Sequence, residues 1–146
     1  MPVDQPCGIR STRFEFSPNR PGFRAGLAIV LERQGRHNEA LDAVNREMTD
    51  YLLLRTRSVL HFRGGSLTES DRDLQTLIHR YGDHVASNVA AAYGARGDAD
   101  RAFEWLERAY AVRDSGLSYV KCHWMLEPVQ ADPRWPVFLL KRGFEE

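Results

Sequence analysis

The sequence predicts an all-α protein in which consecutive helices pair as antiparallel hairpins. Six segments, each of about three to four turns, place apolar side chains at helical spacing. The connections between these segments are only a few residues long, and such short loops force neighbouring helices to run antiparallel. No alternating run of β-branched residues competes for a strand. These three observations together define the predicted fold class.

The first hairpin is predicted from residues 23–34 and 38–48. Gly35 follows the first apolar stripe directly, and a glycine at that place is typical of a helix end. The apolar positions are Phe23, Leu27, Val30 and Leu31 in the first helix, and Ala40, Leu41, Val44 and Met48 in the second.

The second hairpin is predicted from residues 51–62 and 66–81. Gly64 and Gly65 stop its first helix, and Ser66 with Glu69 has the spacing of a capping box for its second helix. The apolar residues of that second helix are Leu74, Leu77, Ile78 and Tyr81.

The third hairpin is predicted from residues 84–97 and 99–112. Its first helix is rich in alanine, and Asp83 precedes it as an expected cap. Asp98 stands at the equivalent place before the second helix.

The three hairpins share an internal repeat when they are aligned on their turns. Gly35, Gly65 and Gly97 lie at the turns, 30 and then 32 residues apart. Small residues recur seven before and five after each glycine, and larger apolar residues recur nine after it. This periodicity predicts that small residues bring two helices close together while larger ones fill the remaining space. The predicted packing residues are Leu27, Ala28, Leu31, Ala40, Val44, Ser58, Ser70, Leu74, Val89, Ala90, Tyr93, Ala102, Leu106 and Ala109.

This pattern resembles the tetratricopeptide repeat (TPR). Residues 88–110 fit the repeat closely and residues 27–48 fit it well, while the second copy departs from it at His61 and Ser70. The resemblance implies a TPR-like right-handed superhelix of three antiparallel helix hairpins plus a short C-terminal capping helix. The implied repeats cover about 21–50, 51–82 and 83–115, and the cap covers 116–146.

The C-terminal part carries a narrower resemblance. The pieces "AFEWLERAY", "RDSGL", "DPRW" and "LLKRGF" are similar to the end of repeat modules attached to bacterial adenylate cyclases, Ser/Thr kinases and winged-helix transcription regulators. Pro136 departs from that pattern and is expected to delay the last helix. The resemblance implies a bacterial protein in signalling or transcriptional regulation. It leaves open whether an upstream repeat or effector domain belongs to the protein.

Composition limits the partners and the location. Twenty basic residues balance twenty acidic ones, which argues against nucleic acid or an anionic membrane as the main partner. No apolar run approaches about 18 residues, so no membrane span is expected. The two cysteines, Cys7 and Cys122, do not suggest a disulfide framework, so we expect a reducing, cytoplasmic location.

The N-terminal residues are expected to behave in two ways. Residues 1–13 are polar and predicted to be a disordered tail, with a single TPR-like domain over 14–146. Phe14 and Phe16 are expected to fold back over the first hairpin near Leu27 and Leu41, in place of a missing half-repeat.

The predicted function is non-enzymatic protein binding in a groove lined by the first helix of each hairpin. No nucleophile and base pattern, metal-ligand spacing or phosphate-binding loop is present, so no catalytic residue, metal or cofactor is expected. A plain solvated helix face is the competing interpretation of the groove residues. The alternative function is a self-associating structural protein, such as a homodimer formed through exposed terminal repeat faces. The candidate partner-binding residues are Arg33, Arg55, Val59, Phe62, Arg63, His84, Ser87 and Asn88.

Overall fold

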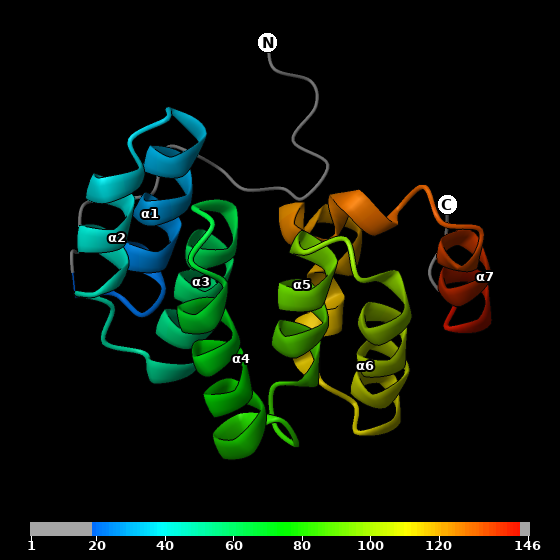
Figure 1. The fold of residues 1–146 in the computed structure, drawn as a ribbon. Coiled ribbons are helices and arrows are strands. Elements are labelled where there is room, and N and C mark those ends of the chain that lie inside the picture. Colours follow the sequence, from blue (N-terminus) through cyan, green and yellow to red (C-terminus); the bar gives the residue numbers. More distant parts are fainter. Residues whose placement is uncertain (1–18, 144–146) are drawn as a thin grey trace, which may run out of the picture.

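A computed structural model describes residues 19–143 of the chain, and every regular element in that range is helical (Figure 1). The elements are α1 (Phe23–Arg33), α2 (His37–Val44), α3 (Asp50–Arg63), α4 (Leu67–Tyr81), α5 (Ala86–Ala95), α6 (Ala99–Ala111), the 3₁₀ helices η2 (Ser115–Cys122) and η3 (Trp124–Val129), and α7 (Arg134–Lys141).

The α-helices form three consecutive pairs. The most extensive helix contacts are α1 with α2, α3 with α4, and α5 with α6. Each new pair joins the preceding one through its first helix, since α3 contacts both α1 and α2, and α5 contacts both α3 and α4. The pairs therefore follow one another in chain order across the molecule, ending at α7 (Figure 1). The all-α prediction is confirmed.

The turn inside each pair contains the glycine that the repeat predicts. Gly35, Gly65 and Gly97 have φ angles of 77°, 83° and 74°. Side chains other than hydrogen are disfavoured in this left-handed region, so glycine is the residue that the turn requires. The three glycines thus share one backbone role.

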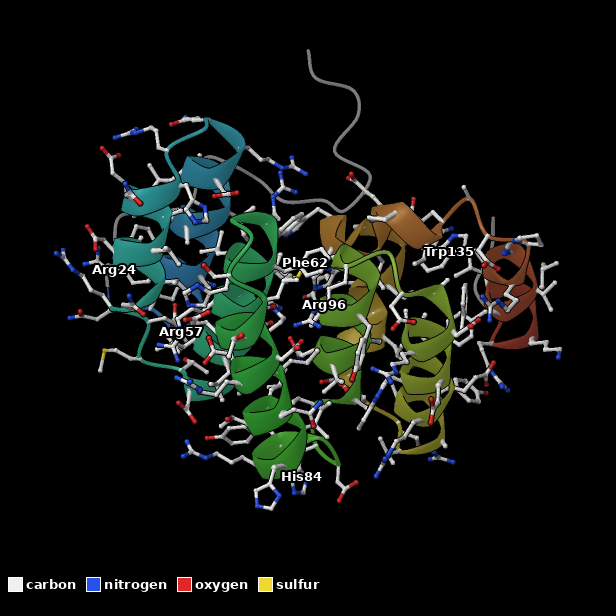
Figure 2. The ribbon with its side chains drawn as sticks, in the orientation of Figure 1. Arg24, Arg57, Phe62, His84, Arg96 and Trp135 are labelled. Atoms are coloured by element: carbon white, nitrogen blue, oxygen red, sulfur yellow. The ribbon has the colours of Figure 1, made fainter. Side chains whose placement is uncertain are left out.

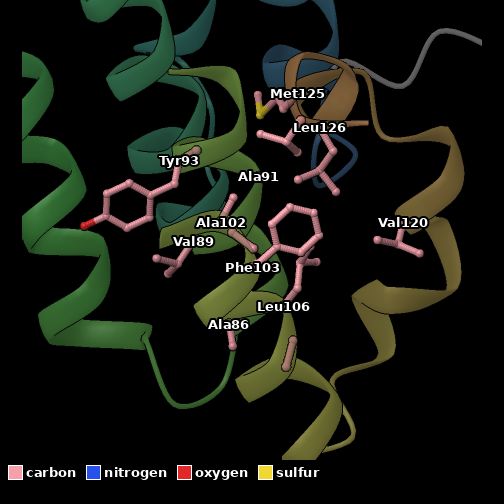
Figure 3. Close-up of a cluster of buried hydrophobic side chains, with 14 of the residues drawn as sticks. Ala86, Val89, Ala91, Tyr93, Ala102, Phe103, Leu106, Val120, Met125 and Leu126 are labelled. Atoms are coloured by element: carbon pink, nitrogen blue, oxygen red, sulfur yellow. The ribbon is translucent and has the colours of Figure 1, made fainter. Parts of the chain in front are cut away.

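The predicted packing residues are buried, with Leu27 as the exception. Ala28, Ala40, Ala90 and Ala102 are each 0% exposed. Leu27 is only partly buried and packs against the smaller of two apolar clusters, the one that centres on α1 and α2. The larger cluster extends from α3 to α7 and includes Val89, Phe103 and Leu106 (Figure 3).

The second pair uses serines at its two small positions. Ser58 and Ser70 are fully buried. The Ser70 hydroxyl donates to the Ser58 carbonyl at 2.6 Å, and the Ser58 hydroxyl donates to the Arg55 carbonyl at 2.8 Å. Because both buried hydroxyls are hydrogen-bonded, serine replaces alanine here without an unsatisfied polar group.

Helix α2 ends earlier than its apolar pattern predicts. It stops at Val44, and Met48, which was expected on its buried stripe, is 78% exposed. Glu47 is instead the buried residue of this segment, and it accepts backbone hydrogen bonds from Gly22 and Ala25 at the start of α1. Helix α2 therefore ends three residues before Glu47, whose carboxylate caps the start of α1.

Of the three predicted caps, Asp98 is confirmed, Ser66 occupies the N-cap position without a side-chain hydrogen bond, and Asp83 is wrong. The Asp98 side chain accepts from the Arg101 N–H at 3.2 Å, which confirms that cap. Ser66 makes no side-chain cap hydrogen bond. Helix α5 begins at Ala86, and the carboxylate that accepts from its first turn is Asp114, at 2.8 Å from the Ser87 nitrogen.

The C-terminal cap is more than one short helix. It consists of η2, η3 and α7. Helix α7 begins at Arg134, so Pro136 lies in its first turn and does not delay it. Arg134 pairs with Asp132 and with Asp100 of α6, at 2.9 and 2.7 Å, and this ties α7 to the third helix pair.

Several expectations concern residues outside the described range. The predicted disorder of residues 1–13 and the predicted packing of Phe14 and Phe16 fall there.

Within residues 19–143, no helix combines the length and the apolar character needed to cross a bilayer.

Candidate binding cavities beside the first helices

The C-terminal segment packs on the face of α5 that the repeat pattern leaves bare. Met125 and Leu126 of η3 are 0% and 2% exposed, and they lie beside Ala91 (Figure 3). A Cβ atom added to Gly94 would lie 2.8 Å from Leu126 Cδ2 and 2.9 Å from the Met125 carbonyl oxygen. The small residues of α5 therefore admit η3, a part of the same chain.

We expect Gly94→Ala to destabilise the protein by about 1 kcal/mol, although alanine is the better helix former. Its methyl group meets the η3 backbone, and overpacking outweighs the gain in helix propensity. Gly26→Ala in α1 is the matched control, because nothing lies within 4 Å of the added atom. It should stabilise by about 0.5 to 1 kcal/mol. Chemical denaturation measures the change in the free energy of unfolding for both variants. A change of the same sign in both would show that η3 does not pack closely against Gly94.

The first cavity lies between α1, α3 and η3 and has a volume of about 270 Å³. Arg33 reaches across it, 3.8 Å from the Glu127 carboxylate and 5.6 Å from the centre of the Trp124 ring. Arg63 on the opposite side pairs with Glu32 at 3.2 Å. The wall is completed by Ile29, Ala95, Met125 and Pro128. Both arginines are exposed, so they border a surface that a partner can reach.

The second cavity lies between α3, α5 and η2 and has a volume of about 320 Å³. Its polar side includes Arg55, Asn88 and His123. The remaining lining residues are Ser87, Gly116, Tyr119, Cys122 and Trp124. Trp124, the first residue of η3, borders both cavities.

Arg55 is a half-buried cation at the back of the second cavity. Its Nη1 donates to Asn88 Oδ1 at 2.8 Å and its Nη2 donates to Thr56 Oγ1 at 3.3 Å, while the buried Nε has no partner. Burial lowers the pKa of the Arg55 guanidinium to about 10, against the opposing influence of Tyr51 and Glu47. The side chain therefore stays charged at neutral pH.

His123 is the second buried polar group at this cavity. Burial, with a smaller contribution from the Arg55 charge, lowers the pKa of His123 to about 3, so the imidazole is neutral at pH 7. Its Nδ1 atom is buried and has no hydrogen-bond partner. A neutral imidazole carries one N–H donor, which can be at this nitrogen.

Asp114 holds the rim of the second cavity in place. Its carboxylate accepts from the backbone of Ser87 in α5 and of Gly116 in η2, both at 2.8 Å. A Cβ atom on Gly116 would lie 2.1 Å from the Ser87 hydroxyl, so glycine permits the close approach. The "RDSGL" motif thus joins η2 to the start of α5.

The structure brings together only some of the predicted groove residues. Arg33 and Arg63 border the first cavity, and Arg55, Ser87 and Asn88 border the second.

The other three predicted groove residues lie elsewhere. Val59 is 1% exposed and belongs to the core, because its position on α3 faces the helix pairs that flank it. Phe62 is covered by Arg96, whose guanidinium lies 5.3 Å from the ring centre. His84 is exposed in the loop before α5, far from the Phe62 and Arg96 pair (Figure 2). A groove made of all eight residues is therefore not present.

Sequence reasoning missed the residues that η2 and η3 contribute. Tyr119, His123, Trp124 and Glu127 lie in a segment without a helical apolar period, so no pattern assigned them to the first-helix face. The bare alanine and glycine face of α5 was the one signal that another segment would approach there.

Cys122 is disulfide-bonded, although the two cysteines did not suggest a disulfide framework. Cys7, the only other cysteine of the sequence, lies outside the described residues. Over residues 19–143, no three His, Cys, Asp or Glu side chains are grouped so that they could hold a metal ion.

Comparison with known proteins does not add a relative from which a role could be transferred. No protein-family model, no curated protein and no solved structure matches this chain.

Proposed function

We propose that this protein is a non-enzymatic protein–protein interaction module with a TPR-like right-handed superhelical arrangement. A peptide or partner protein binds in a concave groove formed by α1, α3 and α5, where η3 leaves the first cavity open. The module acts in bacterial signalling or transcriptional regulation, and it binds neither nucleic acid nor membrane. The cytoplasmic location remains part of this proposal, although the disulfide at Cys122 removes one of its supports.

The observation that carries this proposal is the mixed chemistry of the first cavity. Arg33 and Arg63 expose about half of their side chains, 59% and 51%, at its edge. Trp124 and Ile29 supply apolar surface within the same cavity. Arginine beside an aromatic ring is typical of protein interfaces, because the guanidinium forms forked hydrogen bonds and the ring buries a large area.

Position-specific photo-crosslinking tests the groove. Benzoylphenylalanine at position 63 is expected to form a covalent adduct with a partner in an extract of the native host. The same group at Gln75, an exposed residue of α4, is the matched control and should not form that adduct. Equal adduct formation from both positions, with unchanged melting temperatures, would place the partner elsewhere than in the groove.

Self-association is the alternative function, and one feature of the C-terminal end favours it. Val137 and Leu140, three residues apart on α7, are 49% and 62% exposed. Apolar residues at the end of a helical stack attract another copy when no further element covers them. In the crosslinking experiment, an adduct of twice the chain mass would support this alternative, and light scattering would give the mass in solution.

A further inference from the structure

Arg55 differs from most other arginines of the described chain in its partners. Arg57 forms two 2.7 Å hydrogen bonds with Asp73, Arg63 pairs with Glu32, and Arg96 pairs with Asp71. Within residues 19–143, Arg55 donates to the uncharged side chains of Asn88 and Thr56. Arg46 and Arg72, by contrast, lie exposed to water, and the partly buried Arg24 lies against the Phe23 ring.

A half-buried cation whose hydrogen-bond acceptors are all uncharged is energetically costly, even though the Glu47 carboxylate acts on Arg55 through its charge. Removing a charge from water is unfavourable unless an opposite charge or several hydrogen bonds replace the solvent. The guanidinium has five N–H donors, and the structure gives acceptors to only two of its three nitrogens. Donors therefore remain for an anion that approaches Arg55.

The cavity in front of Arg55 suits a ligand with one anionic end and a carbon skeleton. Among residues 19–143, no acidic side chain lines it. The Asp114 carboxylate, which holds the lining residues Ser87 and Gly116, is engaged by their backbone N–H groups. Tyr119 and Trp124 supply aromatic surface, and the volume of about 320 Å³ is at the lower end of small-molecule sites.

We propose that this second cavity binds an organic acid, whose carboxylate pairs with Arg55 and whose carbon skeleton lies against Tyr119 and Trp124. A carboxylate matches the planar donor fork of arginine. Asn88 orients the guanidinium through its 2.8 Å hydrogen bond, and His123 is a further polar residue of the lining. The proposal stands on this cavity alone and does not require a protein partner in the first cavity.

Two sources share this carboxylate chemistry: a free organic acid and the carboxyl terminus of a peptide. The probes are therefore benzoate and indole-3-acetate, with benzamide and indole-3-acetamide as uncharged matches. A tripeptide ending in tryptophan is added as its free acid and as its amide. Binding is followed by calorimetry and by the ¹⁵N–¹H resonance of the Arg55 side-chain Nε in the full-length protein.

We expect at least one acid to bind at least tenfold more tightly than its amide and to shift the Arg55 Nε resonance, but not that of Arg63. Arg55→Met should weaken this binding at least tenfold, whereas Arg63→Met, the matched change in the first cavity, should leave it unchanged. Tyr119→Ala removes a side chain that is 63% exposed, so it tests the aromatic wall without threatening the fold.

The outcomes separate the two sources and allow the proposal to fail. Preference for the free acids identifies a small-molecule site, and preference for the peptide acid identifies a carboxyl-terminus site. The proposal is overturned if acid and amide bind with equal affinity, or if no acid binds at millimolar concentration. It is also overturned if Tyr119→Ala and a folded Arg55→Met both bind the acid as tightly as the wild type does. None of these outcomes depends on crosslinking at position 63.

Discussion

Replacing Ala102 by leucine is expected to lower the free energy of unfolding by about 1 to 3 kcal/mol, and Ala90→Leu should have a similar effect. Both alanines are 0% exposed, one on each helix of the third pair. The added carbon atoms have no space at a contact between two helices, so the helices must separate or the side chain must adopt a strained rotamer. Thermal and urea denaturation measure the loss.

Ala111→Leu provides the control for this prediction. Ala111 ends α6 and is exposed, so leucine there changes helix propensity very little and meets no neighbouring helix. Wild-type stability in Ala90→Leu and Ala102→Leu would show that the small residues of the repeat are not the contact that sets the helix spacing.

The helix pairs were predictable because their signals are local in the sequence. A left-handed glycine such as Gly65 and a small residue such as Ala90 each reflect the backbone or the nearest helix, and the same roles recur in every pair. Serine at positions 58 and 70 weakened the pattern. The structure explains the change, because each hydroxyl finds a carbonyl within its own helix pair.

The caps and helix ends were less predictable because they depend on residues far away in the chain. Asp114 accepts from the first turn of α5, 27 residues earlier, and Glu47 reaches Gly22 across 25 residues. A capping rule reads only the nearest neighbours, so it selected Asp83 instead. That aspartate pairs with Arg108 of α6.

The candidate site was predicted only in part, for a physical reason. Helical periodicity identifies which residues of α3 and α5 share a face, and Arg55 and Asn88 were found in this way. The same periodicity does not say what covers that face. The covering segment is a pair of 3₁₀ helices, in which the period of three is short-lived and the apolar pattern is weak. The apolar pattern of the sequence therefore could not assign His123 and Trp124 to the site.

Glu47 supplies a long-range cap whose charge state affects stability. It is 5% exposed, and its carboxylate accepts backbone hydrogen bonds from Gly22, Ala25 and Thr49 at 3.0 to 3.1 Å. Burial by itself raises the pKa of this carboxyl group, but the hydrogen bonds from Ala25, Thr49 and Gly22 outweigh it. The net result is a pKa below the ordinary value of 4.5. The ionised form is thus the one that the fold stabilises.

We expect Glu47→Gln to lower the free energy of unfolding by about 1 to 3 kcal/mol at pH 7, because an amide offers one acceptor oxygen where the carboxylate serves three N–H groups. Since the pKa of Glu47 is lower in the folded state, its contribution is complete above about pH 4.5 and disappears as the pH falls through the folded value. The deficit of Glu47→Gln should therefore shrink in urea denaturations between pH 5 and pH 3. Glu104→Gln, at an exposed position of α6, should match the wild type throughout. A deficit that stays constant down to pH 3 would show that the charge of Glu47 does not stabilise the start of α1.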